Sequence, residues 1–188
     1  MRRTFYIGIV LLTVLAQQPA LAADIPSAAG ACVGGQTETT PSTAFAALDD
    51  GSRVRHAPTE LEWQRCALGQ TWAAAENRCA GRPKTFSWLQ VGRLTPLLTE
   101  GWRLPTGQEL MSIIEKCHVS PAINLQVFPN TPSALFWTSS IDSGGVERIW
   151  SLSFFSGLAY RSSTLQAARV RLVRGTFKPP PPESEPAN

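Results

Sequence analysis

The sequence predicts an α+β domain in which short helices occupy the middle of the chain and β-hairpins its end. Residues 102–117 combine a proline turn, a helix cap and an apolar stripe at helical spacing. From Leu135 onwards, short segments of alternating polarity are separated by turns rich in Gly and Ser. Because helices and hairpins occupy separate parts of the chain, this order favours α+β over a repeated βαβ unit.

The first 22 residues have the pattern of a signal peptide. Arg2 and Arg3 form a basic start, and Phe5 to Leu15 form an apolar core that is too short to span a bilayer. Ala20–Ala22 offers a small-x-small cleavage site, and cleavage after Ala23 fits nearly as well. We therefore expect export to the periplasm or the cell exterior, with no membrane span after cleavage.

The remaining chain divides into three parts. Residues 23–31 predict a flexible lead-in, residues 32–175 one domain, and residues 176–188 an extended Pro-rich tail. The formal net charge of the chain is +3, and removal of Arg2 and Arg3 with the signal leaves +1. Such a balance does not favour nucleic-acid binding, although it permits a local basic patch.

Four cysteines in an exported chain predict two disulfides. Cys66 and Cys79 flank a short segment and are expected to pair, which leaves Cys32 for Cys117. In the chain-entropy model, these bonds stabilise the fold by roughly 3 and roughly 4–5 kcal/mol. The alternative is a zinc site made of thiols and His118, which the lack of a closely spaced cysteine pair disfavours. We expect no bound metal.

Strands and helices are expected in the first two thirds of the domain. The expected strands are Val54–His56 and Leu61–Arg65, on either side of a turn at Ala57–Pro58. Thr71 is expected to cap a helix over Trp72–Arg78, where Ala and Glu favour helical structure.

Two further helices are expected. Ser87 is the expected cap of a weaker helix over Trp88–Leu94. Thr106 is the expected cap of the next one, and Glu109 completes a capping box three residues later. The apolar stripe of this helix consists of Leu110, Ile113, Ile114 and Cys117.

Four strands are expected in the last third. They are Leu135–Ser140, Val146–Phe154, Leu158–Arg161 and Ala168–Arg174, with turns at 142–145 and 155–157. Alternation places Trp150 on the inward face of the second of these strands. In the last strand, Val170 and Leu172 are expected to point inwards, and Arg169 and Arg171 outwards.

An ordered series of short motifs resembles one bacterial family. The motifs are EWQRC (62–66), GQTW (69–72), CAG (79–81), WRLPT (102–106), PAIN (121–124), VFPNTP (127–132), FWTSS (136–140) and VRLVRG (170–175). Together they resemble the family named for the C-terminal domain of the Legionella collagen-like adhesin, over roughly residues 32–175. The resemblance implies a C-type lectin-like fold related to that of the formylglycine-generating enzyme.

The resemblance also implies a ligand class, since the adhesin of this family binds sulfated glycosaminoglycans. The collagen-like repeat of the adhesin is absent here, so trimerisation is not implied. The calcium-dependent sugar motifs of animal C-type lectins are missing as well; Phe128–Asn130 mimics one of them but lacks its carboxylate. We therefore expect no calcium and no other cofactor.

Most residues of the shared motifs are interpreted as structural. These are Trp63, Trp102, Arg103, Thr106, Glu109, Trp137, Arg171 and Arg174. About four of the six tryptophans are expected in the core. The arginines are expected to tie loops to backbone carbonyls or to a carboxylate such as that of Glu109.

The candidate ligand-binding residues lie outside these motifs, on the last hairpins. They are Arg148, Tyr160, Arg161 and Arg169, and segments 141–148 and 155–167 are expected to present them. The alternative is that these arginines only solubilise the surface. The expected partner is an anionic glycan, or otherwise a protein of the cell envelope or of a pilus-like surface structure; the oligomeric state is left open.

The sequence predicts no catalytic residue. His56 and His118 are the only histidines, and no Gly-x-Ser-x-Gly nucleophile motif accompanies them. A thiol-dependent oxidase of the formylglycine-generating type is the enzymatic alternative, and it would require a close pair of reduced cysteines.

Overall fold

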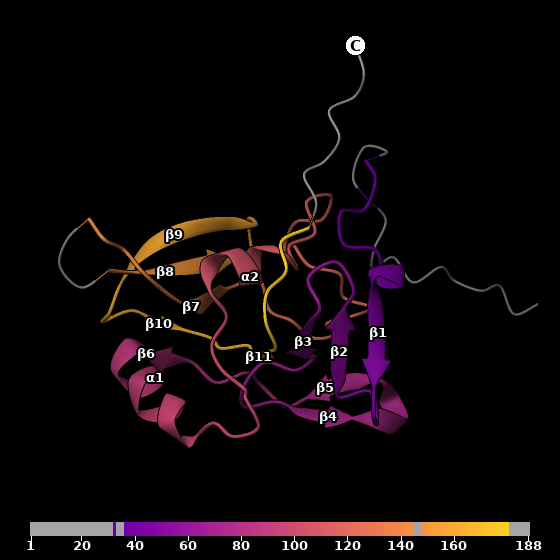
Figure 1. Ribbon diagram of the computed structural model, residues 1–188, viewed down its shortest axis with the longest axis horizontal. Helices are drawn as coiled ribbons and strands as arrows, with labels where there is room; N and C mark the ends of the chain where they lie inside the picture. The colour runs from indigo at the N-terminus through magenta and orange to yellow at the C-terminus, as the bar shows by residue number, and fades with distance from the viewer. Residues whose placement is uncertain (1–31, 33–35, 145–147, 181–188) are drawn as a thin grey trace, which may run out of the picture.

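The computed structural model describes residue 32 and residues 36–144 and 148–180. Four small antiparallel sheets and a few short helices make up this part of the chain, which agrees with the predicted α+β class (Figure 1). The expected signal peptide, the lead-in and the end of the Pro-rich tail lie outside the described residues. No described helix has the length and apolar character needed to cross a membrane.

The largest sheet joins the beginning and the end of the domain. Its strands, in spatial order, are β1 (Phe45–Leu48), β2 (Arg53–His56), β3 (Leu61–Gln64) and β11 (Val173–Arg174). A short 3₁₀ turn, η2 (Ser42–Ala44), precedes β1. The expected pair of strands on either side of the turn at residues 57–58 is confirmed. Val173 lies opposite Trp63, which places the last strand beside the third.

The expected helix over Trp72–Arg78 is wrong. The segment forms a hairpin of β4 (Thr71–Ala73) and β5 (Arg78–Ala80), with only a 3₁₀ turn, η3 (Ala74–Glu76), between the strands. Asn77 reverses the chain with a φ of 47°, and Trp72 pairs with Cys79. The Trp72 ring lies 4.3 Å from the Arg65 guanidinium carbon. These tertiary contacts override the helix propensity of Ala and Glu.

Both capped helices form, although the second is shorter than expected. Ser87 caps α1 (Trp88–Leu94) and Thr106 caps α2 (Gly107–Met111), each through a complete capping box. A 3₁₀ turn, η4 (Thr95–Leu97), extends α1. The apolar stripe after Thr106 is buried throughout, but its later residues lie in turns beyond α2.

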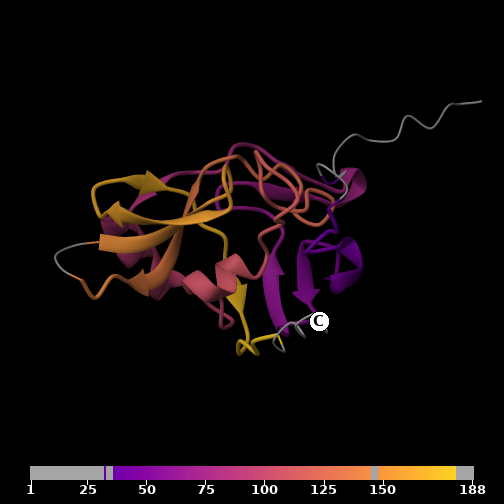
Figure 2. The ribbon, with the colours of Figure 1, turned by 90° about the horizontal axis from the view of Figure 1, so that it is seen from above.

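The last hairpins form a second sheet at the opposite end of the domain (Figure 2). Its strands are β7 (Leu135–Ile141), β8 (Arg148–Ser153) and β9 (Leu158–Ser163). Trp150 is partly buried, on the same side of β8 as the fully buried Leu152, so its expected inward orientation holds only in part. Ile149 and Ser151, on the other side of β8, are buried as well.

Residues 167–174 do not form one strand. The segment contributes β10 (Ala167–Ala168) to a two-stranded sheet with β6 (Phe86–Ser87), and then β11 to the first sheet. Between them, the Arg169 N–H donates to the Leu135 carbonyl, while the Leu172 carbonyl accepts from the Gln64 N–H. The segment thus runs between the two larger sheets.

The position of this segment between the two sheets explains why the expected outward orientation of its arginines is wrong. Val170 and Leu172 are buried as expected, but Arg171 is completely buried and Arg169 is partly buried, instead of both facing solvent. A segment with a sheet on either side has no solvent face, so alternation alone cannot place its charged side chains outside.

Two apolar clusters form the core. One lies between the large sheet and the loops that follow α2, around Trp63, Phe128, Phe136 and Phe154. The other lies between α1 and β7, around Val91, Leu104, Trp137 and Val170. Trp63 and Trp137 are fully buried, and the partly buried Trp88 and Trp102 pack against the second cluster, so four of the six tryptophans contribute to the core, as expected.

A buried carboxylate attaches the start of the described chain to the domain. Glu115 accepts hydrogen bonds from the N–H groups of Thr39 (2.9 Å), Thr40 (2.6 Å) and Cys117 (3.1 Å), and from both threonine hydroxyls. Burial alone would raise the pKa of Glu115, but these hydrogen bonds outweigh it and lower the pKa to about 2.

Replacing Glu115 by Gln is expected to reduce the free energy of unfolding at pH 7 by on the order of 2–3 kcal/mol, because an amide satisfies these donors less well. The folded-state pKa is depressed, so the carboxylate contributes its full stability above about pH 4.5 and loses it as the pH falls towards 2. Urea unfolding of both proteins from pH 7 to pH 2 measures this contribution. The difference should shrink with falling pH; equal stability at pH 7 would refute the assignment.

Candidate functional site

Two candidate arginines share one face of the second sheet with a tryptophan. Trp150 on β8 lies directly opposite Arg161 on β9, and Arg148 lies opposite Ser163. Directly opposed residues point to the same side of a sheet, so Arg148, Trp150 and Arg161 occupy one side. We call these three residues the β8–β9 face.

The two arginines of the β8–β9 face differ in their contacts. Arg161 lies over the Trp150 ring, 5.2 Å from its centroid, and its Nε lies 3.3 Å from a carboxylate oxygen of Asp142. Arg148 is exposed and forms no ion pair with any residue that the structure describes. An exposed guanidinium can donate two parallel hydrogen bonds to a sulfate or carboxylate group.

A groove of about 410 Å³ adjoins the β8–β9 face. It lies between α2 and the second sheet, with Trp150, Leu152 and Ala159 along the sheet and Met111 along the helix. Thr138, Ser140 and Ser151 also line it. Trp150 therefore belongs both to the groove and to the arginine-bearing face, an arrangement suited to a ligand with an apolar ring and a negative charge.

The structure does not bring all four candidate residues together. Tyr160 lies opposite Ser151 on the other side of the sheet, where its hydroxyl lies 3.3 Å from that of Ser156. Arg169 is partly buried, and its backbone bridges to Phe136 on β7. Sequence reasoning missed Trp150 and Asp142 as members of the site. The missing information was the β8–β9 register, which places Trp150 opposite Arg161, and the side-chain contact between Asp142 and Arg161.

The arginines expected to be structural bind carboxylates and carbonyls. Arg103 forms a two-pronged ion pair with Glu109, with distances of 2.7 and 2.6 Å. Burial opposes ionisation of Glu109, but hydrogen bonds from Arg103 and Thr106 lower its pKa. Arg174 contacts Glu62 at 2.7 and 2.6 Å and lies over the ring of Trp102, 4.9 Å from its centroid. The first pair holds the chain before α2 against that helix, and the second joins β11 to β3.

Comparison with known protein families now identifies the domain. Residues 52–174 match the family model described as the Lcl C-terminal domain. The chain belongs to this family. The matched region runs from the start of β2 to the end of β11, so it includes both helices and the β8–β9 face. No curated protein matches the chain.

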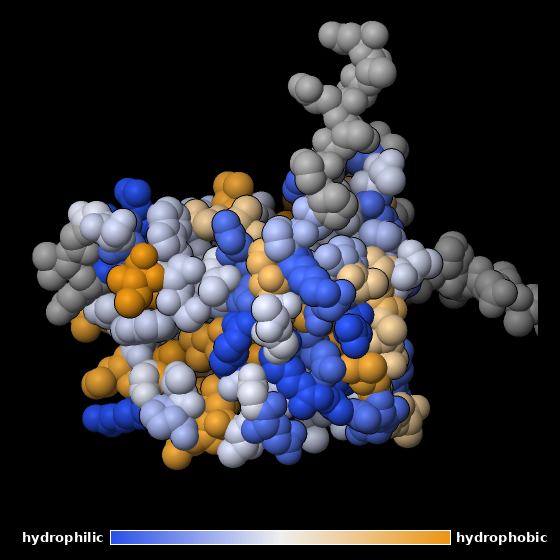
Figure 3. Space-filling model, viewed as in Figure 1, coloured by the Kyte–Doolittle hydropathy of each residue, from blue (hydrophilic) through white to orange (hydrophobic). Residues whose placement is uncertain are grey.

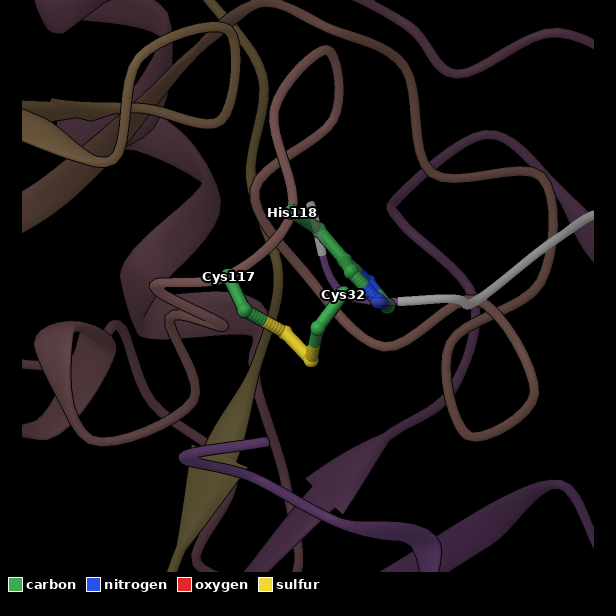
Figure 4. Close-up of side chains that lie close together, drawn as sticks. All are labelled: Cys32, Cys117 and His118. Carbon is green, nitrogen blue, oxygen red and sulfur yellow. A yellow bond between two sulfur atoms is a disulfide. The ribbon is translucent and has the colours of Figure 1, made fainter. Parts of the chain in front are cut away.

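The four cysteines of this Lcl C-terminal domain form two disulfides, Cys66–Cys79 and Cys32–Cys117. His118 lies next to the second bond, and the three side chains come within 4.8 Å of one another (Figure 4). The alternative zinc site would use these groups as ligands. Because the two sulfurs are bonded to each other, neither is a thiolate, and the imidazole is the one remaining donor of the three.

The other histidine is a buried structural residue. The His56 ring stacks on Phe45 with centroids 4.6 Å apart, and its Nδ1 lies 2.8 Å from the Thr59 hydroxyl. Burial lowers the pKa of His56 to about 4, so the ring is neutral at physiological pH.

An alkylating reagent tests the sulfur chemistry directly. Iodoacetamide added to the protein in denaturant without reductant is expected to modify none of the four cysteines, because disulfide sulfur does not react. After reduction, intact-mass spectrometry should show four added groups. Any modification before reduction would disprove the two bonds.

Proposed function

We propose that this Lcl C-terminal domain is a C-type lectin-like recognition module that binds anionic glycans at the β8–β9 face and performs no catalysis. Membership of the family favours a surface module of the adhesin type, and the two disulfides fit an exported protein. The candidate ligand-binding surface belongs to the last hairpins, as the sequence analysis expected, but it is built around Trp150 instead of Tyr160 and Arg169.

One observation carries the proposal, namely the shared orientation of Arg148, Trp150 and Arg161. In the proposed complex, Arg148 donates hydrogen bonds to a sulfate or carboxylate of the glycan. The sugar ring lies in the groove against Trp150, and Arg161 contributes a second positive charge at its edge. Asp142 holds Arg161 in place before the ligand arrives, which reduces the entropy lost on binding.

The bonded cysteines also support a binding role over an enzymatic one. A thiol-dependent oxidase needs a reduced cysteine pair in a cleft, whereas each cysteine of this chain is joined to another. The perturbed carboxylates Glu109 and Glu115 are held by hydrogen bonds to neighbouring groups, which is the arrangement of structural residues.

The double substitution Arg148→Gln/Arg161→Gln is expected to weaken binding of a heparin oligosaccharide about tenfold, because two exposed charge contacts are lost. The matched control is Arg82→Gln/Arg93→Gln, which removes two exposed arginines that form no ion pair with a described residue. Calorimetric titration at graded salt measures both. The proposal fails if the control weakens binding as much as the test variant, or if the unchanged protein does not bind heparin at low salt.

A protein partner is the second candidate function, and the open edge of β9 favours it. β9 is the outermost strand of its sheet, and five of its six residues are exposed. Leu158 and Tyr160 are 59% and 45% exposed, and the single charge of the strand, Arg161, is paired with Asp142. Exposed edge strands that carry few charges are suited to pairing with a strand of another chain.

If β9 pairs with an envelope protein, Leu158→Lys/Tyr160→Lys should abolish that contact, because charges on an edge strand oppose strand addition. Crosslinking in intact cells, followed by mass spectrometry, would identify the partner with the unchanged protein. The control is Leu89→Lys/Leu97→Lys, which places two charges at positions 66% and 74% exposed near α1. A partner that survives the β9 substitutions rules out this edge.

A further inference from the structure

A second cleft, of about 510 Å³, lies between α1 and the beginning of α2. Trp88, Val91 and Thr95 line it from the side of α1 and η4, and Leu104 lines it from the opposite side. Figure 3 shows apolar surface between these helices, next to a hydrophilic band over the strands of the large sheet. None of the residues of the β8–β9 face lines this cleft.

The walls of the cleft are fixed in position by contacts behind them. The capping boxes at Ser87 and Thr106 fix where α1 and α2 begin. Trp88 packs edge-on against the buried Trp137, with ring centroids 5.5 Å apart. The Trp137 indole N–H donates to the Phe86 carbonyl at 2.7 Å, which fixes the ring that supports Trp88. The cleft is therefore preformed, as ligand sites usually are.

The charged groups of the cleft neutralise each other. The two terminal nitrogens of Arg103 donate to both carboxylate oxygens of Glu109 and to the carbonyls of Leu104 and Gly175. The Thr106 N–H also donates to Glu109, at 2.7 Å. Both charges are thus occupied within the protein, and a charged ligand would lose its hydration without gaining a counter-ion.

Three hydroxyl groups supply the remaining polar capacity. Those of Thr95 and Ser139 donate to the carbonyls of Val91 and Pro105, so their oxygens can still accept a hydrogen bond. The Thr106 hydroxyl accepts from the Glu109 N–H and keeps its own hydrogen to donate. Two acceptors and one donor at the border of an apolar cleft suit a ligand with hydroxyl groups along one edge.

Gly92 makes the space for such a ligand. It lies on the same side of α1 as Trp88, Val91 and Thr95, which follow the i, i+3, i+4, i+7 spacing of one helix face with it. A Cβ atom placed on Gly92 would meet no atom within 4 Å. Glycine costs about 1 kcal/mol relative to alanine inside a helix, so neither packing nor helix stability explains its presence here.

We propose that the cleft between α1 and α2 binds an uncharged six-membered ring with an apolar face and a hydroxyl-bearing edge. The apolar face lies against Trp88, Val91 and Leu104, and the edge forms hydrogen bonds with Thr95, Thr106 and Ser139. Phenolic rings and neutral pyranoses share this chemistry. The site is independent of the proposed anionic-glycan site, because it presents no free charge.

Titrations of the disulfide-bonded protein, followed by ¹H–¹⁵N NMR, test the proposal. The probes are 4-methylphenol and methyl β-glucopyranoside, with benzoate and benzylammonium as charged rings. At least one neutral probe is expected to shift the Trp88 indole N–H with a Kd on the order of 1–10 mM, at least tenfold tighter than either charged ring. The neutral probe with the lower Kd shows whether the cleft prefers a phenolic ring or a neutral pyranose.

The proposal is overturned if neither neutral probe shifts Trp88 or if the charged rings bind equally well. Gly92→Phe, which fills the cleft, is expected to weaken the neutral probe at least tenfold, whereas Leu89→Phe, on the exposed side of α1, should leave its binding unchanged. The titration of the unchanged protein decides the matter even if Gly92→Phe does not fold. Gly92→Phe should still bind heparin, so failure at the cleft is distinguishable from failure at the β8–β9 face.

Discussion

The guanidinium of Arg171 lies completely buried where the two larger sheets meet, and the surrounding structure is organised to keep it there. One terminal nitrogen donates to the carbonyls of Gln64 and Arg65, and the other to the Thr131 hydroxyl at 2.6 Å. Phe128 lies against it, with 4.7 Å between the guanidinium carbon and the ring centroid. No described carboxylate pairs with Arg171.

A buried cation without a counter-ion is tolerated only if neutral dipoles replace its hydration. Burial lowers the pKa of Arg171 to about 9, so the side chain remains charged at neutral pH. Its partners come from two separate parts of the chain, namely the end of β3 and the loop before β7. Their positions must therefore be fixed together, which makes Arg171 a connection between segments that share no strand pairing.

Charged side chains that bond to backbone groups also connect loops that lack secondary structure. Arg65 donates to the carbonyls of Gly51, Gln126 and Val127, and Glu115 accepts from the segment at residues 39–40. With the two disulfides, these contacts stiffen a domain whose strands and helices are short. A stiff frame lowers the entropic cost of presenting a binding surface, and most side chains of both proposed sites lie on strands and helices of this frame.

Local signals in the sequence were sufficient where a few neighbouring residues decide the structure. The caps at Ser87 and Thr106, the first strand pair and the last hairpins follow from such signals, and the even number of cysteines predicted the two bonds. The prediction failed where distant segments decide. Trp72 belongs to a hairpin because of Arg65 and Cys79, and Arg171 is buried because sheets lie on both sides of it. The register between β8 and β9, which brings Trp150 to Arg161, is likewise a property of the fold.

NMR of arginine side chains can establish whether Arg171 is a charged, immobile connection inside the domain. At pH 7 we expect separate, slowly exchanging Nη–H signals for Arg171, because its terminal nitrogens are held by the carbonyls of Gln64 and Arg65 and by Thr131. A single averaged signal that exchanges rapidly with water, like that of an exposed arginine, would show that Arg171 does not connect these segments.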